Sequence, residues 1–320
     1  APEHGGEKFV FRFADASPEQ RDADASCFLG LGLSDAQWDQ IDGALGSERG
    51  TVLVAGPTGS GKTTLLYSLL RYLNKPWRSI VTLEDPIERP IDGLSQTAIA
   101  PERGQTYASL LKALLRHDPD VIMLGEIRDE EAAAAALTAG ITGHIVLSTL
   151  HASNCFDVLL RLIQFGCRRE LIQLSLSLII AQRLVGRVCS SCVEWQTPND
   201  ALRALLNLTP ARTLPVCSGC PSCDGRGIEG RIGVFELLNP EGLFRSSAHV
   251  TTSPIGKAHW PPDSNSVYRE MQRSGYQPLA FRVRELLLSG VIPVSEALRA
   301  LGCAPHRFGY CLPVAFDRAR

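Results

Sequence analysis

The clearest chemical signal is GPTGSGKTT at 56–64, between an apolar run and a segment with helical spacing. Glycines at this spacing let loop N–H groups turn inward around a β-phosphate, and the following helix adds the positive end of its dipole. We expect Lys62 to reach the β- and γ-phosphate oxygens and the Thr63 hydroxyl to take a place on Mg²⁺. The predicted phosphate-binding residues are Gly56, Pro57, Thr58, Gly59, Ser60, Gly61, Lys62, Thr63 and Thr64.

Three polar clusters follow other apolar runs: EDPIE (84–88), GEIRD (125–129) and STLHA (148–152). In an open parallel sheet, ligands bind outside the carboxyl ends of the strands. These clusters are therefore expected to converge on the nucleotide.

Four side chains in these clusters are candidates for phosphoryl transfer, which needs a metal, charge neutralisation and an oriented water. Glu126 ends the third apolar run and is a candidate for the Mg²⁺ shell or for polarising water. Glu84 and Glu88 compete with it for water activation. His151 is a candidate γ-phosphate sensor or a strand cap. The sequence leaves the choice of base open.

Two cysteine pairs, Cys189-x2-Cys192 and Cys220-x2-Cys223, are separated by 27 residues. Each C-x-x-C turn presents two thiolates at a spacing suited to one tetrahedral Zn²⁺. A metal site is favoured over a disulfide framework because disulfides rarely persist in the cytosol. Cys217 also forms C-x-x-C with Cys220. Four protein ligands without an open position predict a structural site.

Apolar runs alternate with segments of helical spacing, at 51–56, 79–84, 121–126 and 144–149. Continuous Val/Ile/Leu runs between helices indicate an α/β protein with a parallel sheet covered on both faces. LIQLSLSLIIAQRLV (171–185) is interpreted as a buried helix, because its Gln, Ser and Arg residues disfavour a membrane span.

Composition bounds the function classes. The 320 residues are 44% hydrophobic and 21% charged, with a formal charge of −2, as in a globular chain long enough for two domains. The chain has no excess of basic residues that would attract nucleic acid, and its segment CSSCVEWQTPND (189–200) is acidic. The opening APEHGGEKF lacks the features of a signal peptide. We expect a cytoplasmic protein without nucleic-acid partners.

Four segments together carry a family resemblance: GPTGSGKTTLLY, TLEDPIE, HDPDVIMLGEIRD and TGHIVLSTLHASN. In order and spacing they resemble the Walker A, Asp box, Walker B and His box of the secretion ATPase superfamily. The chain is most similar to its GspE/PilB branch, the assembly ATPases of type II secretion and type IV pili. The resemblance runs from about 31 to 238.

This resemblance implies a RecA-like P-loop NTPase core, a small four-cysteine zinc module and a C-terminal helical region. It also implies a homo-hexamer that hydrolyses Mg²⁺-ATP at the inner membrane of a bacterium, as a peripheral cytoplasmic protein. The implied partners are an inner-membrane platform protein and a cytoplasmic docking protein of a secretion or pilus machine. Retraction-type pilus ATPases are disfavoured because that branch lacks the four-cysteine module.

Site residues carry over by motif position. Lys62 and Thr63 match the phosphate and Mg²⁺ ligands, and Glu126 matches the Walker B acid. The other matching positions are Glu84, Asp85 and Glu88 in the Asp box, His151 in the His box, and Arg116 and Arg128.

The resemblance also assigns the zinc ligands. The family's second knuckle is followed by G-x-x-G-R-x-G, which Gly227, Gly230, Arg231 and Gly233 match behind Cys223. The implied ligands are Cys189, Cys192, Cys220 and Cys223, and Cys217 is then a spare thiol.

Members of this branch carry further domains before the motor core, and arginines from the preceding domain reach a neighbouring subunit's nucleotide. Arg12, in FVFRF, is a candidate for one of these. The expected regions are a domain remnant or linker (1–34), a RecA-like ATPase core (35–186), a zinc module (187–238) and a C-terminal helical region with an irregular insertion and tail (239–320).

Two functions follow from this interpretation. The first is a Mg²⁺-ATP-hydrolysing hexameric motor that powers assembly of a type II secretion pseudopilus or a type IV pilus. The alternative is a nucleotide-binding scaffold with little turnover, because N-terminal domains and arginine fingers are missing. An arginine finger contributes several orders of magnitude in rate, so its loss favours the scaffold.

Overall fold

The computed structural model describes residues 25–302 except 207, 210, 242, 244–270, 272 and 274. Arg12, the candidate insertion at 246–266 and the tail from 303 lie outside the described residues.

Seven strands form one sheet in the order β3-β2-β4-β5-β1-β6-β9. Neighbouring strands are parallel, except that β9 runs antiparallel to β6. The predicted α/β fold is confirmed, and the four predicted apolar runs correspond to β1, β2, β4 and β5. The strands are β1 (Gly50–Ala55), β2 (Ile80–Glu84), β3 (Ser95–Ala98), β4 (Val121–Leu124), β5 (Ile145–Leu150), β6 (Leu176–Val188) and β9 (Ile228–Leu238).

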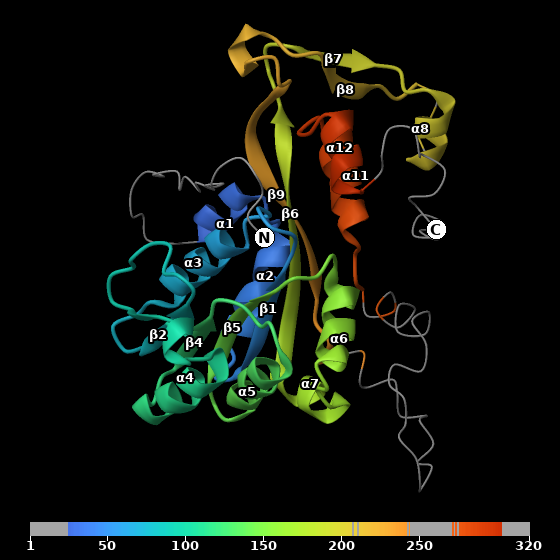
Figure 1. Ribbon diagram of the computed structural model, residues 1–320. Helices are drawn as coiled ribbons and strands as arrows, with labels where there is room; N and C mark the ends of the chain where they lie inside the picture. The colour runs from blue at the N-terminus through green and yellow to red at the C-terminus, as the bar shows by residue number, and fades with distance from the viewer. Residues whose placement is uncertain are drawn as a thin grey trace, which may run out of the picture.

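Helices cover both faces of this sheet (Figure 1). Residues of β1 alternate between the two faces, since Val52 and Val54 join one core and Leu53 and Ala55 the other. One face carries α1 (Ala25–Leu31), α2 (Asp35–Leu45) and α3 (Lys62–Leu73). The opposite face carries α4 (Tyr107–Leu114), α5 (Glu130–Ile141), α6 (Cys155–Gln164) and α7 (Arg169–Ser175).

One predicted polar cluster, GEIRD, ends in a helix cap, and another, STLHA, is followed by a cap two residues later. The Asp129 carboxylate accepts the Ala132 N–H at 2.8 Å at the start of α5. The Asn154 side chain accepts the Asp157 N–H at 2.7 Å at the start of α6. Both caps satisfy N–H groups of a first helical turn, so they fix where the preceding loops end.

The predicted helix at 171–185 is wrong. The chain there forms the end of α7, up to Ser175, and then enters β6, which lies between β1 and β9. Leu178 and Ile180 face one core while Ile179 and Ala181 face the other. A strand buried on both faces gives a continuous apolar run, which periodicity does not separate from a buried helix.

Strands β6 and β9 extend past the other strands of the sheet toward a second, smaller part of the molecule (Figure 1). A third core joins Val185 and Val234 of these strands to the helices around them. The predicted boundary between 186 and 187 falls inside β6, and the four-region division stays a prediction. The remaining elements are β7 (Val193–Gln196), α8 (Asp200–Leu205), β8 (Leu214–Cys217), α11 (Leu279–Leu288), α12 (Val294–Ala300) and the 3₁₀ turns at Pro101–Arg103, Leu115–His117 and Pro221–Cys223.

Candidate nucleotide site and metal centre

The loop at 56–61 connects the end of β1 to the start of α3. Gly61 is the N-cap of α3 with φ +88°, a left-handed conformation that glycine adopts without strain. At Gly56 a Cβ atom would lie 2.6 Å from the Gln182 carbonyl oxygen, so only glycine fits there. The loop N–H groups and the N-terminus of a 12-residue helix therefore lie at one end of β1.

Lys62 folds back over this loop. Its Nζ donates to the carbonyl oxygens of Gly56 at 2.9 Å and Pro57 at 3.1 Å. Burial lowers the pKa of Lys62, while the nearby Glu126 carboxylate raises it and Arg183 lowers it. Both hydrogen-bond acceptors of the ammonium group are neutral carbonyls, and an anion in the loop is a stronger partner for it.

Two buried polar atoms near the loop have no hydrogen-bond partner among the described residues: Ser60 Oγ and Gln182 Oε1. The Ser60 hydroxyl lies 2.4 Å from where a Gly56 Cβ would be, and the Gln182 amide nitrogen lies 2.9 Å from a Gly61 Cβ. Buried polar groups are normally paired, and unpaired ones are candidates for an additional partner such as a ligand or water. The Ser60 hydroxyl can donate to a bound phosphate, whereas Gln182 Oε1 is an acceptor and suits a water or another donor.

Glu126, Arg128, Asp85 and His151 form one charged cluster across two polar loops and the end of β5. Glu126 accepts a hydrogen bond from Arg128 Nε, and its other oxygen lies 3.1 Å from His151 Nε2. Arg128 Nη1 also reaches Asp85 at 3.3 Å. The Glu126 side chain is 16% exposed while His151 is 58% exposed, so the pair lies at the surface of the loops.

Glu84 is placed differently from the other carboxylates. It is only 3% exposed, and its Oε1 accepts hydrogen bonds from Thr82 at 2.7 Å and Gln96 at 3.0 Å. The Tyr67 hydroxyl donates to Oε2. Burial and this hydrogen bond raise the pKa of Tyr67. A carboxylate with three buried donors is well suited to holding its loop in place.

Glu88 lies at the opposite end of the Asp-box segment and is exposed. The Thr63 hydroxyl donates to its Oε1 at 3.4 Å, and its backbone N–H donates to the Tyr67 hydroxyl at 3.3 Å. Glu88 and Thr63 are thus neighbours at the start of α3. A carboxylate and a hydroxyl oxygen are both ligands suited to Mg²⁺.

The remaining predicted residues have simpler surroundings. Pro57, Thr58, Gly59 and Thr64 are exposed on the loop and the first turn of α3. Arg116 is exposed in the 3₁₀ turn that follows α4, and within the described part of the chain no hydrogen bond or ion pair joins it to the charged cluster.

Sequence reasoning missed several residues that shape this site. Tyr67 and Gln96, which hold Glu84, lie in an apolar helix and in a short edge strand, where nothing marked them as polar partners. Arg183 donates to the Ser153 carbonyl oxygen at 2.7 Å, next to the His151 segment. In the sequence, Arg183 is marked by the polar pair Gln182-Arg183 inside an apolar run. Interpreting this run as a buried helix kept that pair from being recognised as part of the site.

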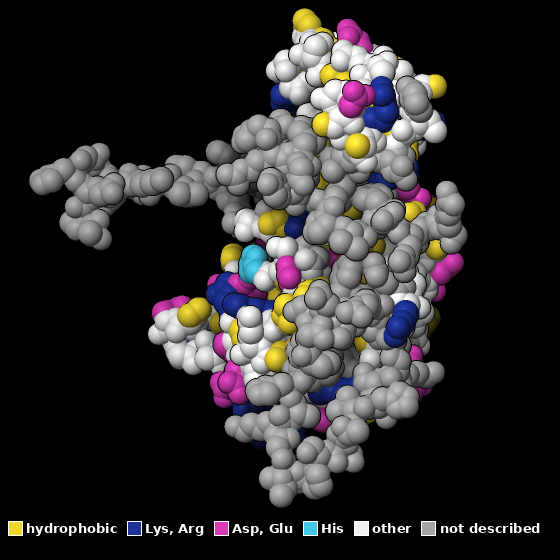
Figure 2. All heavy atoms as spheres, turned by 90° about the vertical axis from the view of Figure 1, so that its right-hand side faces the viewer, with side chains coloured by type: hydrophobic (Ala, Val, Ile, Leu, Met, Phe, Trp, Pro, Cys, Tyr) yellow, Lys and Arg dark blue, Asp and Glu magenta, His cyan; other side chains and the backbone are white. Residues whose placement is uncertain are grey.

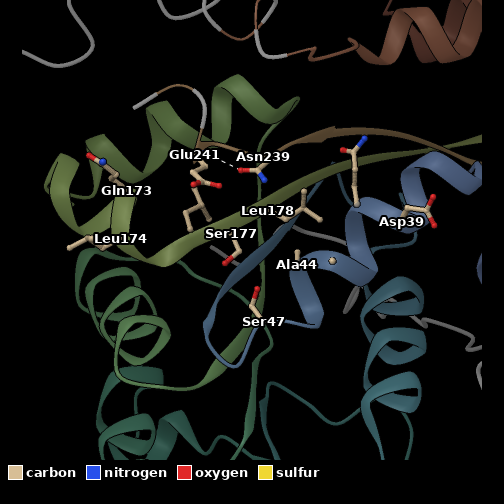
Figure 3. A pocket seen from close by; sticks show the side chains of 12 residues that line it. Asp39, Ala44, Ser47, Gln173, Leu174, Ser177, Leu178, Asn239 and Glu241 are labelled. Carbon is tan, nitrogen blue, oxygen red and sulfur yellow. Dashed lines mark hydrogen bonds between the residues drawn. The ribbon is translucent and has the colours of Figure 1, made fainter. Parts of the chain in front are cut away.

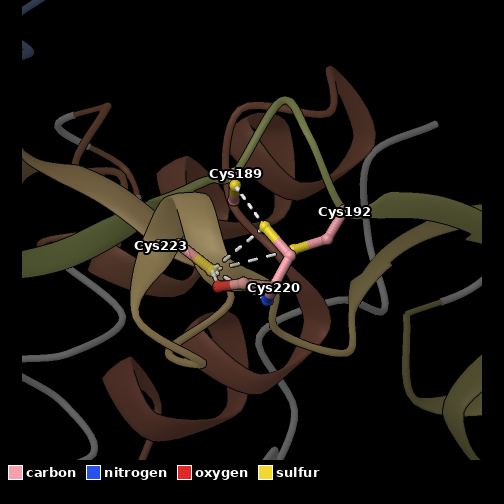
Figure 4. Close-up of side chains that lie close together, drawn as sticks. All are labelled: Cys189, Cys192, Cys220 and Cys223. Atoms are coloured by element: carbon pink, nitrogen blue, oxygen red, sulfur yellow. Dashed lines mark hydrogen bonds between the residues drawn. The ribbon is translucent and has the colours of Figure 1, made fainter.

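The four cysteines of the two knuckles converge in space (Figure 4). Their sulfur atoms all lie within 4.8 Å of one another, with separations of 3.8 Å for Cys189–Cys220 and 3.9 Å for Cys192–Cys223. Zn–S bonds of about 2.3 Å in a tetrahedron place sulfurs about 3.8 Å apart. The spacing is far too long for a disulfide, whose S–S bond is about 2.05 Å. The cluster therefore fits a tetrahedral metal ion.

The local backbone also favours the thiolate form of Cys223. The N–H groups of Cys220 and Gly227 donate to Cys223 Sγ at 3.2 and 3.1 Å. These hydrogen bonds, that from Cys220 most strongly, lower the pKa of the Cys223 thiol to about 6. Cys217 lies outside the four-sulfur group, at the end of β8. Cys155 and Cys167, which are not among the predicted ligands, are buried.

A pocket of about 560 Å³ lies elsewhere on the molecule (Figure 3). It is lined by residues of α2, α7 and β6 and by Asn239 and Glu241, and by none of the predicted site residues. On the described part of the face in Figure 2, basic and acidic side chains are interspersed. Among the described residues, no helix has both the length and the apolar character of a membrane span.

The sheet order and the loop between β1 and α3 define a RecA-like P-loop NTPase fold with an added four-cysteine cluster. The sequence profile of the family described as Type II/IV secretion system protein matches residues 1–280. The chain belongs to this family.

Relatives and solved structures agree with this membership. The chain is 39% identical to the Type II secretion system protein E of Dickeya dadantii over 269 residues, which are 84% of this chain and 53% of the relative. Its fold is similar to the pilus retraction motor PilT solved with bound ADP, with a TM-score of 0.60 and 28% identity over 87% of this chain and 66% of the other. It is also similar to the Legionella pneumophila ATPase DotB, with a TM-score of 0.59 and 25% identity over 86% and 64% of the chains. The chain spans about half the length of the curated relatives it matches.

Proposed function

We propose that this chain is the motor core of an ATPase that powers type II secretion pseudopilus or type IV pilus assembly. The observation that carries the proposal is Lys62, held over the P-loop by two carbonyl oxygens, with Glu126 close enough to shift its pKa and His151 beside Glu126. The relatives named Type II secretion system protein E support the process, and the ADP-bound PilT structure supports the ligand.

In this proposal, Lys62 exchanges its two carbonyl partners for phosphate oxygens, and the loop N–H groups bind the same anion. Thr63 and Glu88, which already contact each other, would hold Mg²⁺, and the ion would neutralise phosphate charge. Asp85 fixes Arg128, and Arg128 in turn orients Glu126.

Glu126 is the proposed base because it is the carboxylate with both partial exposure and a histidine partner. Its Oε2 is placed to accept a proton from a water whose oxygen bonds to the γ-phosphorus as the bond to ADP breaks, and His151 Nε2, 3.1 Å away, is placed to orient this carboxylate. Glu84, fully hydrogen-bonded, positions the Asp-box segment instead of exchanging protons. The proposal thus assigns different roles to Glu126, Glu88 and Glu84 according to how deeply each carboxylate is buried.

The four-cysteine cluster is proposed to hold Zn²⁺ as a structural ion. Its support is the sulfur spacing and the two N–H donors to Cys223. Metal analysis of protein purified without chelator is expected to find one zinc per chain, which Cys223→Ser abolishes and Cys217→Ser retains. Protein without zinc, or equal loss in both variants, contradicts the assignment.

The assembly is proposed to be a homo-hexamer, peripheral to the inner membrane of a bacterium on its cytoplasmic side. Its proposed partners are a platform protein in that membrane and a cytoplasmic docking protein, without nucleic acid. The names of the relatives support a role in a secretion machine. Size measurement of the purified chain with nucleotide tests the hexamer, and a nucleotide-independent monomer opposes it.

The direct test of the activity is phosphate release from Mg²⁺-ATP by the purified chain. Wild-type protein is expected to release phosphate, and Lys62→Ala to lose both turnover and nucleotide binding. Binding without turnover supports the scaffold alternative, in which the chain binds nucleotide but turns it over little. Absence of nucleotide binding contradicts both functions.

A further inference from the structure

Glu236 on β9 is a buried carboxylate that the proposed mechanism does not use. It is 2% exposed, and its two oxygens accept hydrogen bonds from two different helices. Oε1 accepts the N–H of Cys155, the first residue of α6, at 2.5 Å. Oε2 accepts the N–H of Leu279, the first residue of α11, at 2.8 Å.

Each of these N–H groups belongs to a first helical turn, where no intrahelical partner exists. The α11 N-cap is Pro278, whose side chain makes no cap, so Glu236 supplies the missing acceptor. Burial raises the pKa of Glu236, while the N–H groups of Cys155 and Leu279 and the Tyr276 side chain oppose this. One carboxylate therefore caps two helices that are far apart in sequence. We call this pair of hydrogen bonds, from Cys155 and from Leu279 to Glu236, the bridge.

The α6 end of this bridge leads to the proposed nucleotide site. The segment from His151 to Asn154 immediately precedes α6 and begins beside Glu126. Arg183 holds the same segment through the Ser153 carbonyl oxygen at 2.7 Å. Arg183 lies on the same face of the paired strands as Glu236, since Ala181 pairs with Glu236 and Arg183 with Val234. It is also close enough to lower the pKa of Lys62.

The α11 end leads to the part of the molecule that carries the cysteines. Val283, Leu286 and Leu287 of α11 belong to the core that includes β6, β9, α8 and α12. Just after α11, the Val291 carbonyl oxygen accepts the N–H of Val188 at 3.0 Å, one residue before Cys189. A shift of α11 thus involves the four-cysteine part of the molecule.

We propose that Glu236 is a positioning residue for nucleotide hydrolysis, because it makes the position of the His151 segment depend on the position of α11. This inference rests on the proposed function and adds a route by which the C-terminal helices regulate it. Glu236 touches no nucleotide in this account. Its effect passes through the α6 N-terminus to His151.

Two variants break the bridge. Glu236→Gln replaces one accepting oxygen with an N–H₂ group that faces an N–H donor. Leu279→Pro removes the first N–H of α11 together with the leucine side chain, at a first helical position where proline is well tolerated. Leu279→Ala is its matched control, because it loses the side chain but keeps the N–H. Glu296→Gln is a second control, because Glu296 on α12 accepts the Gly186 N–H of β6 away from the His151 segment.

The measurements are kcat and KM for Mg²⁺-ATP and hydrogen exchange of the peptide 151–158 without nucleotide. Glu236→Gln is expected to lower kcat by roughly tenfold, with KM changed far less, because one charged hydrogen bond is lost. Leu279→Pro is expected to lower kcat in the same direction and to speed exchange at 151–158. Leu279→Ala and Glu296→Gln are expected to leave kcat and the hydrogen exchange of peptide 151–158 near the wild-type values.

Wild-type kcat and wild-type exchange at 151–158 in both bridge variants would overturn the inference. Faster exchange confined to α11 in Leu279→Pro would overturn it as well. If the wild-type chain itself shows no turnover, the hydrolysis proposal fails on its own. The exchange comparison of Leu279→Pro with Leu279→Ala then still decides whether the bridge exists.

Discussion

Replacing Tyr67 with phenylalanine tests the arrangement that separates Glu84 from the other carboxylates. The Tyr67 hydroxyl donates to Glu84 Oε2 and accepts the N–H groups of Glu88 at 3.3 Å and Arg89 at 3.4 Å. Without it, Glu84 Oε2 stays buried with no donor from α3. Loss of a buried hydrogen bond to a charged group costs about 1.5–3 kcal/mol.

Tyr72→Phe is the matched control on the same helix. Its hydroxyl donates to Asp42 at 2.6 Å in an exposed position, where water replaces the lost bond. Its loss is expected to cost about 0.5 kcal/mol. Urea unfolding of both variants measures the two losses of unfolding free energy under the same conditions. Equal destabilisation by Tyr67→Phe and Tyr72→Phe would refute the placement of Glu84 as a buried, fully bonded carboxylate.

Two further predictions concern the loop. Nucleotide binding favours the ammonium form of Lys62, and burial lowers its pKa below the ordinary 10.5, so affinity for ATP is expected to fall with rising pH before pH 10.5 is reached. Titration with a fluorescent ATP analogue from neutral to alkaline pH measures this affinity. The affinity of Lys62→Arg is expected not to change over this range. A wild-type affinity that is equally independent of pH would oppose the placement of Lys62 at the phosphate. Gly56→Ala is expected to weaken binding by tenfold or more, because its Cβ would lie 2.6 Å from the Gln182 carbonyl oxygen, and to destabilise the fold by about 1–3 kcal/mol. Gly59→Ala faces open space at φ +76° and is expected to cost only about 1 kcal/mol of backbone strain, so equal effects of the two would contradict the geometry.

Much of the sheet and its helices was predictable because local signals and tertiary structure agree. The segment 62–73 has helical spacing after a glycine loop, and α3 has these bounds. The strand runs at 121–126 and 144–149 are apolar because both of their faces are covered by helices. Where that same burial produced a long apolar run at 171–185, the sequence pattern favoured the wrong element.

The candidate site was predictable only as far as chain order and strand ends determine it. The ends of β4 and β5 bring Glu126 and His151 together, as parallel topology leads one to expect. The burial of Glu84 depends on Tyr67 and Gln96, whose hydroxyl and amide come within hydrogen-bond distance of it only after folding. The bridge through Glu236 joins residues 81 and 43 positions away, which no local pattern signals.

The most direct test of the account is a crystal structure of the chain with Mg²⁺ and a non-hydrolysable ATP analogue. The account predicts the β-phosphate inside the 56–61 loop, Lys62 released from its carbonyl partners, and the γ-phosphate facing Glu126 and His151. A loop closed against the analogue at saturating concentration, or a γ-phosphate remote from Glu126 and His151, would contradict it.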